Sequence, residues 1–337
     1  MSISFFEDKP LLKDLDFKLN ILNNFNKIKL DELNNILFYG VPGCGKTIKI
    51  YAFLASILDN RVYDLKNINY EEDKKIMTYK SSIYHIEIDK VNLGSNEKLF
   101  IQSFLKSYTE TKNIGLDLPK IVLVKNANLL TKQSQLALRK IIDKNYKTSK
   151  FIFEISNLSS LISPLKSRFL IIRVPMPSII DVKICIKNYS DRKGFIIEDK
   201  IIDNVIAESS KISNNINLKK IFGFLRYYIL TGNEFKYLYY DTFFQIFELI
   251  TNNKKISFVS INKIREIVNE MYINLVPMNE LLLFLFNKLY DKFNNNDKIL
   301  SYLLDLTIKC DLNLKKGNKE CLHLEYYIIS IIDLLNK

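Results

Sequence analysis

Residues 40–47 read G-V-P-G-C-G-K-T and follow the apolar run Ile36-Leu37-Phe38-Tyr39. Glycines at this spacing let backbone N–H groups turn inward around an anion, and a helix that starts after the loop adds its positive N-terminal dipole. In such loops the lysine contacts the β- and γ-phosphates, and the hydroxyl of the next residue ligates Mg²⁺. The pattern therefore predicts a phosphate-binding loop, with Lys46 on the phosphates, Thr47 on Mg²⁺, and the nucleotide contacted by Val41, Pro42, Gly43, Cys44, Gly45, Lys46 and Thr47.

A second apolar strand, predicted over residues 120–124, runs into Lys125-Asn126. In a P-loop ATPase the strand at this place ends in an Asp that holds Mg²⁺ and a Glu that orients the attacking water. A lysine repels Mg²⁺, an asparagine cannot accept a proton, and residues 119–142 contain no Asp or Glu. Loss of a general base costs about 10²–10⁴-fold in rate. The sequence therefore predicts binding of ATP or ADP, Mg²⁺ binding weakened by the missing Asp, and weak or absent hydrolysis.

Two further strands are predicted over residues 150–155 and 170–174. Asn157 follows the first of them, and a polar residue at the end of a strand next to the phosphate site can sense the γ-phosphate. Between the two strands the chain reads P-L-K-S-R-F, which places Arg168 in the connection.

The order of the predicted elements gives the fold class. Short apolar strands alternate with helical stretches up to residue 174, which is typical of an α/β domain with a parallel sheet and helices on both faces. Nucleotide is then expected beyond the C-terminal ends of the strands. Helices are predicted over residues 132–143 (with Thr131 as N-cap), 179–189, 200–209, 218–230, 240–251, 259–272, 278–293, 297–310 and 319–335. We expect three domains: a nucleotide-binding domain at 1–174, a small helical domain at 175–231 and an all-helical domain at 232–337.

Charge and composition point to the kind of partner. The net charge of +12 favours a polyanion, for which nucleic acid is the obvious candidate. The four cysteines, Cys44, Cys185, Cys310 and Cys321, lack metal-ligand spacing and are interpreted as reduced intracellular thiols. No run of about 18 apolar residues suggests a membrane span, and the N-terminus does not resemble a signal peptide.

The motifs together resemble a known family. The order of phosphate-binding loop, K-I-V-L-V strand, T-K-Q-S-Q-L-A-L-R-K helix, F-I-F-E-I-S-N strand and P-L-K-S-R-F is similar to that of the small subunits of replication factor C, the AAA+ clamp loader that opens the sliding clamp of DNA replication. Residues 84–88 with 94–96, 174–178, and 317–325 resemble the family's second strand, the entry to its lid and the start of its last collar helix. The resemblance is most specific in the first 180 residues and is closest to the subunit 3 type, at one end of the five-subunit arc.

The resemblance implies roles for several residues and partners. It makes Arg168 an arginine finger acting in trans on a neighbour's ATP site, residues 175–231 the lid with Lys219 as its phosphate sensor, and residues 232–337 the collar. The implied partners are sister subunits in a hetero-pentamer, the sliding clamp and primer-template DNA. The family's helices touch DNA phosphates, for which the candidates here are Lys98, Lys132, Arg139 and Lys140.

Three positions depart from the family pattern. Phe169 stands where the family has a cysteine, and Lys219 stands for an arginine, which keeps the charge but loses bidentate contact with phosphate. The family's W-x-x-K-Y-R-P segment is reduced to F-F-E-D-K-P at residues 5–10, without tryptophan.

The leading hypothesis is a clamp-loader subunit that binds nucleotide and hydrolyses it weakly or not at all. It would act inside the cell, in the nucleus or at a cytoplasmic replication site if a large DNA virus encodes it. One alternative is an autonomous AAA+ ATPase of replication or repair, which requires an acidic residue from elsewhere in the fold. Another is a nucleotide-free scaffold whose phosphate-binding loop is vestigial.

Overall fold

The computed structural model describes residues 34–72, 75–111, 118–193, 197–210, 216–232, 239–252, 258–274, 276–294, 296–316 and 319–335. Residues 5–10, compared above with the family's N-terminal segment, lie outside these ranges. The chain divides into two compact units, of which one runs to Ile202 and includes Ile216–Arg226, while the other comprises Asp203–Asn215 and Tyr227–Lys337. Because this division passes through two helices of the expected lid, the three-domain division at 174/175 and 231/232 stays a prediction.

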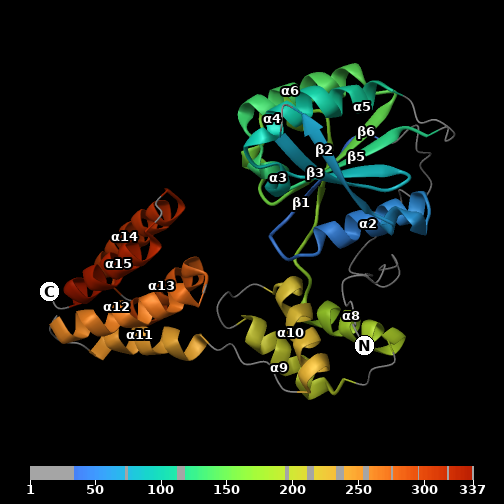
Figure 1. The fold of residues 1–337 in the computed structure, drawn as a ribbon. Helices are drawn as coiled ribbons and strands as arrows, with labels where there is room; N and C mark the ends of the chain where they lie inside the picture. Colours follow the sequence, from blue (N-terminus) through green and yellow to red (C-terminus); the bar gives the residue numbers. More distant parts are fainter. Residues whose placement is uncertain are drawn as a thin grey trace. The chain divides into compact units, whose positions relative to one another are not determined.

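A seven-stranded sheet with the order β2-β3-β4-β5-β6-β1-β7 forms the centre of the first unit (Figure 1). Its strands are β1 (Ile36–Tyr39), β2 (Lys66–Glu72), β3 (Lys75–Ser81), β4 (His85–Asp89), β5 (Lys120–Lys125), β6 (Ser149–Ile155) and β7 (Leu170–Arg173). The five strands from β4 to β7 in this order run parallel, as predicted, and β1 lies between β6 and β7. The loop after β1 therefore emerges beside the end of β6.

The sequence did not predict the antiparallel hairpin at one edge of the sheet. β2 pairs antiparallel with β3, and β3 pairs antiparallel with β4, so the sheet is mixed. Both hairpin strands are mostly exposed. They are anchored through Tyr70 and Tyr79, whose ring centroids lie 4.9 and 4.7 Å from that of Phe104. Aromatic packing across the edge therefore stabilises strands that are too polar to read as core strands.

Helices cover both faces of the sheet, with α2 on one face and α4, α5 and α6 on the other (Figure 1). Alternation along β1 explains the two contacts, because Leu37 belongs to the core cluster that includes Leu138 of α6, whereas Phe38 packs edge-on against Phe53 of α2. The helices of this region are α2 (Lys46–Ile57), α3 (Lys90–Leu93), α4 (Glu97–Phe100), a π-helical turn (Ile101–Leu105), α5 (Lys106–Glu110), α6 (Lys132–Lys144) and α7 (Ser163–Lys166). Short 3₁₀ turns span Asn60–Tyr63, Gly94–Asn96, Ala127–Leu129 and Leu158–Ser160.

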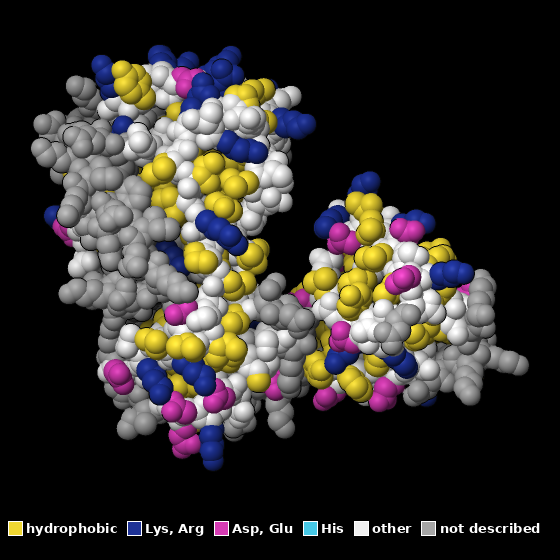
Figure 2. Space-filling view, turned by 180° about the vertical axis from the view of Figure 1, so that it is seen from behind, with side chains coloured by type: hydrophobic (Ala, Val, Ile, Leu, Met, Phe, Trp, Pro, Cys, Tyr) yellow, Lys and Arg dark blue, Asp and Glu magenta, His cyan; other side chains and the backbone are white. Residues whose placement is uncertain are grey.

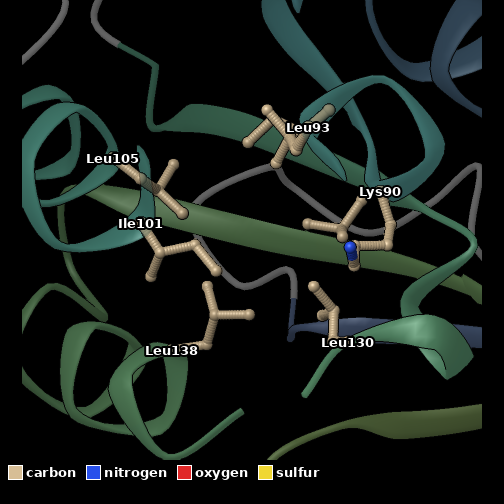
Figure 3. Close-up of a pocket in the computed structure, with 8 residues that line it drawn as sticks. Lys90, Leu93, Ile101, Leu105, Leu130 and Leu138 are labelled. Carbon is tan, nitrogen blue, oxygen red and sulfur yellow. The ribbon is translucent and has the colours of Figure 1, made fainter. Parts of the chain in front are cut away.

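The predicted N-cap and helix of residues 131–143 are confirmed. The Thr131 hydroxyl accepts a hydrogen bond from the Ser134 N–H at 3.3 Å. Between α6 and the sheet lies a cavity of about 10 Å³, lined by apolar side chains and by Lys90 (Figure 3). It holds no residue of the phosphate-binding loop and has room for about one water molecule.

The rest of the chain is helical, as expected. Its helices are α8 (Ile179–Lys193), α9 (Asp199–Ser210), α10 (Leu218–Thr231), α11 (Tyr240–Asn252), α12 (Phe258–Ile273), α13 (Met278–Phe293), α14 (Asp297–Lys316) and α15 (Glu320–Leu335). Most boundaries agree with the prediction to within one residue, but α8 ends later than predicted and α14 continues six residues past Cys310. The extension of α14 is stabilised by Leu314, which is buried one turn further on, and by Lys315 and Lys316, whose charges suit a helix C-terminus.

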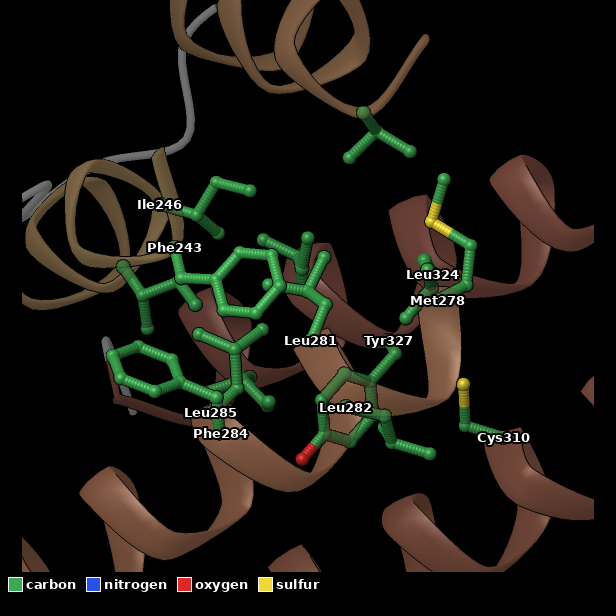
Figure 4. Packing of buried hydrophobic residues seen from close by; sticks show 14 of the residues in the cluster. Phe243, Ile246, Met278, Leu281, Leu282, Phe284, Leu285, Cys310, Leu324 and Tyr327 are labelled. Carbon is green, nitrogen blue, oxygen red and sulfur yellow. The ribbon is translucent and has the colours of Figure 1, made fainter. Parts of the chain in front are cut away.

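The five helices α11–α15 share one apolar core. Phe243 and Ile246 of α11 meet Leu281 and Leu285 of α13, and Tyr327 of α15 lies beside them (Figure 4). The Tyr327 hydroxyl is 3.0 Å from the Thr307 hydroxyl, so its polar end is satisfied within the core. The predicted all-helical domain thus has a core of its own.

Candidate nucleotide-binding site

The phosphate-binding loop has the backbone that its glycines predict. Gly43 and Gly45 have φ values of 84° and 87°, a region that favours glycine, and α2 begins immediately afterwards at Lys46. The first N–H groups of a helix lack partners within the helix, so this end of α2 offers donors to an anion. Val41 and Pro42 are exposed at the tip of the loop, whereas Cys44 is buried.

Lys46 is folded back into its own loop. The side chain is buried, and its Nζ donates to the backbone oxygens of Gly40 at 2.9 Å and Val41 at 3.2 Å. These carbonyls hold the ammonium group within the turn that a phosphate would occupy. When a phosphate binds, its charged oxygens would replace these two neutral carbonyls as acceptors for Lys46. Hydrogen bonds to a charged acceptor are stronger than those to a neutral one.

The start of α10 contacts the loop. The backbone N–H of Leu218 donates to the Gly43 oxygen at 3.0 Å, and a β-carbon added at Gly43 would lie 2.2 Å from Oδ1 of Asn217. Lys219, the expected phosphate sensor, follows Leu218 and is exposed. Asn217 was not a candidate in the sequence, yet its side chain lies against Gly43, as the Leu218 side chain lies against Gly45.

Thr47, the expected Mg²⁺ ligand, is hydrogen-bonded to a carboxylate that the sequence did not indicate. Its Oγ1 donates to Glu154, with the two carboxylate oxygens at 3.0 and 2.9 Å. Glu154 belongs to β6, is half-buried, and is paired in register with Phe38 of β1. Burial raises the pKa of the Glu154 carboxyl, while the Thr47 bond and the charges of Lys125 and Lys46 oppose that rise.

The sequence prediction considered only acids within residues 119–142, and Glu154 lies outside that stretch. A lone glutamate within the apolar run F-I-F-E-I was the available signal, because a charged residue in a buried strand needs a partner. The partner is Thr47, 107 residues away.

Lys125 is neutralised on the other side of β5. Its Nζ lies 2.6 Å from Oε1 of Glu87 on β4 and 5.1 Å from the ring centroid of Tyr51 on α2. The Tyr51 hydroxyl also donates to Glu87. Burial and the neighbouring Glu87 raise the pKa of Tyr51, so the phenol stays protonated. The charge of Lys125 is therefore paired with that of Glu87.

Asn126 adopts a left-handed backbone conformation, with φ 51°, which asparagine tolerates better than most residues. Its Nδ2 donates to Oδ1 of Asp89 at 2.9 Å, and the same oxygen accepts the N–H of Val91 at the start of α3. Oδ1 of Asp89 thus accepts two hydrogen bonds. The place of the water-orienting glutamate holds an amide that is itself hydrogen-bonded.

Asn157 lies at the end of β6, where the sequence placed it, but its side chain caps the following turn. Its Oδ1 accepts from the Ser159 N–H at 3.0 Å, and the residue is exposed. Because side chains alternate along a strand, Ser156 rather than Asn157 continues the face on which Glu154 meets Thr47.

Arg168 lies between α7 and β7 with its side chain 25% exposed. Its Nη2 donates to Oδ2 of Asp143 at 2.8 Å, its Nε donates to the other carboxylate oxygen, and Nη1 donates to the Pro164 oxygen. This bond to Arg168 holds the pKa of the Asp143 carboxyl below its ordinary value. The guanidinium is therefore held at the end of α6. Its hydrogen-bond partners among the described residues are Asp143, Pro164 and Ser167, none of which belongs to the phosphate-binding loop.

The candidate DNA contacts gather on the helical face of the first unit. Nζ of Lys98 on α4 donates to Oε1 of Gln133 on α6 at 3.2 Å, and Lys132 precedes Gln133 in the first turn of α6. Glu97 fixes this pair of helices, because its Oε1 accepts from the Thr131 N–H and the Ser134 hydroxyl. Figure 2 shows Lys and Arg side chains gathered at the end of this unit where Figure 1 draws α4–α6.

The remaining two candidates, Arg139 and Lys140, lie further along α6. Arg139 is 3.9 Å from Asp143 and so shares that carboxylate with Arg168, whereas Lys140 is exposed. The structure therefore joins Lys98 to the first turn of α6, where Lys132 lies, and places Arg139 next to the Arg168 site.

Comparison with known proteins gives relatives over almost the whole chain. Replication factor C subunit 5 of Saccharomyces cerevisiae is 27% identical over 333 residues, 94% of each chain. The chain is similar to this replication factor C subunit over nearly its whole length. A putative replication factor C small subunit of Acanthamoeba polyphaga mimivirus is 27% identical over 98% of this chain and 91% of its own length, and human replication factor C subunit 3 is 27% identical over 58% and 56%. The resemblance predicted from the motifs is confirmed, and it includes the subunit 3 and subunit 5 types.

No family model matches the chain. Among solved structures, AMPPCP-bound DnaA from Aquifex aeolicus has a TM-score of 0.47 at 14% identity over 93% of each chain. A RuvB variant from Thermotoga maritima has a TM-score of 0.45 at 17% identity over 82% of this chain and 84% of its own. Within the described residues no helix is long and apolar enough to span a membrane.

Proposed function

We propose that the chain is a small subunit of a replication factor C-type clamp loader, which helps to load a sliding clamp onto primed DNA. The observation that carries this proposal is the match to replication factor C subunit 5 over 94% of both chains, helical C-terminal region included. Sister subunits in a hetero-pentamer, the clamp and primer-template DNA are the proposed partners. The proposed place of action is the nucleus, or a cytoplasmic replication site if a large virus encodes the chain.

Nucleotide binding is proposed at the loop of residues 41–47, with ATP or ADP as ligand. The left-handed glycines, the start of α2 and Lys46 supply donors to phosphate, and the residues present also fit Mg²⁺. A hydroxyl and a carboxylate lie within hydrogen-bond distance at Thr47 and Glu154, and Mg²⁺ prefers such hard oxygen ligands together with substrate phosphates. When bound, Mg²⁺ neutralises negative charge on the phosphates. No group of three His, Cys, Asp or Glu side chains suited to a metal alone occurs among the described residues, so the ion is expected to arrive with the nucleotide.

Hydrolysis by the chain itself is proposed to be weak or absent. Asn126 cannot take up a proton, and the adjacent Asp89 carboxylate already accepts two hydrogen bonds. A missing general base lowers the rate by about 10²–10⁴-fold. The chain's contribution to turnover is instead Arg168, proposed to reach the ATP site of a neighbouring subunit, where such an arginine is worth about 10³–10⁵-fold.

DNA contact is proposed through Lys98 on α4 and Lys132 in the first turn of α6, with Arg139 and Lys140 further along α6. Lysine and arginine at these places would pair with phosphates and position the protein without reading sequence. Each phosphate contact contributes about one unit to the slope of the logarithm of the binding constant against the logarithm of the salt concentration.

The test is nucleotide binding and turnover measured on the same purified chain, with Lys46→Ala as control. We expect fluorescent ATP and ADP to bind, this binding to be lost in Lys46→Ala, and no turnover to exceed that of the variant. In the complex assembled with its sister subunits, Arg168→Ala should lower ATPase activity while assembly is unchanged. Equal nucleotide binding by the wild type and Lys46→Ala would contradict the proposal and favour the scaffold.

A second candidate, the autonomous ATPase, is favoured by one observation. It required an acidic residue from outside the sequence 119–142, and Glu154 is such a residue. Turnover by the purified chain that disappears in both Lys46→Ala and Glu154→Gln would establish this function.

A further inference from the structure

The carboxylate that contacts Thr47 belongs to β6, which is the neighbour of β5, the strand that ends without an acidic residue. β5 and β6 pair in parallel register with Val124 opposite Phe153, so the last residue of β5, Lys125, comes beside Glu154. Both side chains point to the α2 face, which is the face of the phosphate-binding loop. At the level where an acid on β5 is expected, the sheet therefore presents a lysine between Glu154 on β6 and Asp89 on β4. The lysine itself is paired with Glu87, two residues before Asp89 on β4.

Acidic side chains offset the lysine charges of this row. Glu87 takes up the Lys125 charge at 2.6 Å, and both side chains are largely buried, 4% and 16% exposed respectively. Glu154 then remains as the carboxylate that faces Thr47 and the loop. Lys46 and Lys125 are set against three acids, Glu87, Glu154 and the Asp89 that lies in register with Lys125, so this group is not net positive. Lys125 without these acids would leave it strongly positive. A cation could enter the group with its acids but would be repelled from the group without them.

The contact with Thr47 also distinguishes Glu154 from an ordinary buried acid. Both carboxylate oxygens lie within 3.0 Å of the hydroxyl at the first turn of α2, where phosphate-binding loops place their Mg²⁺ ligand. A carboxylate needs only one of these oxygens for the hydroxyl. The other oxygen can accept a hydrogen bond from a water molecule bound to Mg²⁺, which is how the acid of a P-loop site acts on the ion.

We propose that Glu154 replaces the missing acid of β5, so that Thr47 and Glu154 together hold Mg²⁺ on the bound nucleotide while Glu87 neutralises Lys125. This inference rests on the proposed nucleotide binding and deepens it. In P-loop ATPases the end of one strand both holds Mg²⁺ and supplies the base for hydrolysis. Here Glu154 of β6 would take over the first role, while Asn126 still occupies the position of the base. The site then retains Mg²⁺-nucleotide without the proton acceptor for its hydrolysis.

The test measures how much Mg²⁺ tightens nucleotide binding, which is a readout separate from turnover. A fluorescent ATP analogue is titrated with the wild type, Glu154→Gln and Glu154→Asp, each with Mg²⁺ and with excess EDTA. Removing a carboxylate that acts on a metal through its ligand shell costs about 10–100-fold in metal affinity. We expect Glu154→Gln to lose about that factor of Mg²⁺-dependent tightening while binding in EDTA is retained, and Glu154→Asp to recover part of it.

Glu110→Gln is the matched control, because Glu110 is a surface glutamate paired with Lys144 on the face that carries α5 and α6. It should leave both titrations unchanged, and thermal unfolding of each variant checks that the fold is intact. Manganese electron paramagnetic resonance adds a direct view of the ion, and the bound Mn²⁺ signal formed with ATP should weaken only in the Glu154 variants.

Three outcomes would overturn the inference. If Glu154→Gln keeps the wild-type gain from Mg²⁺, Glu154 only orients the Thr47 hydroxyl. If Glu154→Gln binds nucleotide more tightly by the same factor with and without Mg²⁺, Glu154 only repels phosphate. If the wild type binds no nucleotide under either condition, the proposed function fails and this inference fails with it. The first two results leave the proposed nucleotide binding intact, so the two failures are distinguishable.

Discussion

His85 is expected to make the stability of the sheet-containing unit depend on pH. Its imidazole lies in β4 with no exposed surface, Nδ1 is 2.6 Å from the Ser82 hydroxyl, and Nε2 is buried without a hydrogen-bond partner among the described residues. The ring of Tyr51 from α2 packs against it, while Lys125 on β5 and Glu87 on β4 act on it with opposite charges. Burial is the largest cause and lowers the pKa of His85 from 6.5 to about 4.

The sign follows from the two states. The unfolded chain binds a proton at His85 near pH 6.5 and the folded chain only near pH 4, so stability is lost as the pH falls through this window. Between about pH 7.5 and pH 5 the His85 contribution to the free energy of unfolding falls by about 2 kcal/mol. This figure is insensitive to the folded pKa, because pH 5 lies above it and the unfolded pKa sets most of the loss.

The assay compares the wild type with His85→Gln by native-state hydrogen exchange of peptides from β4 and β5. Comparing the two proteins at each pH cancels the intrinsic pH dependence of amide exchange. We expect the wild type to lose about 2 kcal/mol more than His85→Gln between about pH 7.5 and pH 5. The chain has two histidines, so His323→Gln on α15 is the matched control and should behave as the wild type in these peptides. Parallel loss of stability in the wild type and His85→Gln would refute the reasoning.

Three other predictions follow from the site and its supports. Gly43→Ala places a β-carbon 2.2 Å from Asn217 at a left-handed φ, so nucleotide affinity measured by fluorescence should fall by tenfold or more, about 1.4 kcal/mol, with the fold kept by circular dichroism. Arg168→Ala removes the hydrogen-bond donor that lowers the Asp143 pKa, so carbon NMR should show that carboxyl titrating at a higher pH. Glu97→Ala breaks a buried ion pair and two hydrogen bonds to α6, which should destabilise the first unit by about 3–5 kcal/mol in hydrogen exchange of α4–α6.

Local patterns in the sequence were sufficient for the elements that position the loop. The run at residues 36–39, the glycines of the loop and the periodic apolar residues after Thr47 predict β1, the turn and α2 without reference to the rest of the chain. Helices α6 and α10–α15 were predicted for the same reason, since each carries its core face within its own sequence. The edge hairpin β2–β3 was missed because its stability comes from Tyr70 and Tyr79 packing on a helix more than twenty residues away.

The electrostatics of the site could not be predicted in this way. Which carboxylate reaches Thr47 depends on β6 lying between β5 and β1 and on the register that sets Glu154 opposite Phe38. A shift of one residue would turn Glu154 to the opposite face of the sheet. The sequence showed that the acids were missing after β5, but only the order and register of the strands show which acid stands beside the loop.

Lys125 and Asn126 therefore have unequal consequences, although both replace acidic residues at one strand end. The effect of Lys125 is electrostatic, and charge can be restored from a neighbouring strand, as Glu87 and Glu154 do on either side of it. The effect of Asn126 concerns a proton, because an amide cannot accept one from the attacking water. Its amide instead donates a hydrogen bond to Oδ1 of Asp89. On the proposed function, this difference explains how a subunit can keep Mg²⁺-nucleotide in place while its own turnover is lost and Arg168 acts on a neighbour.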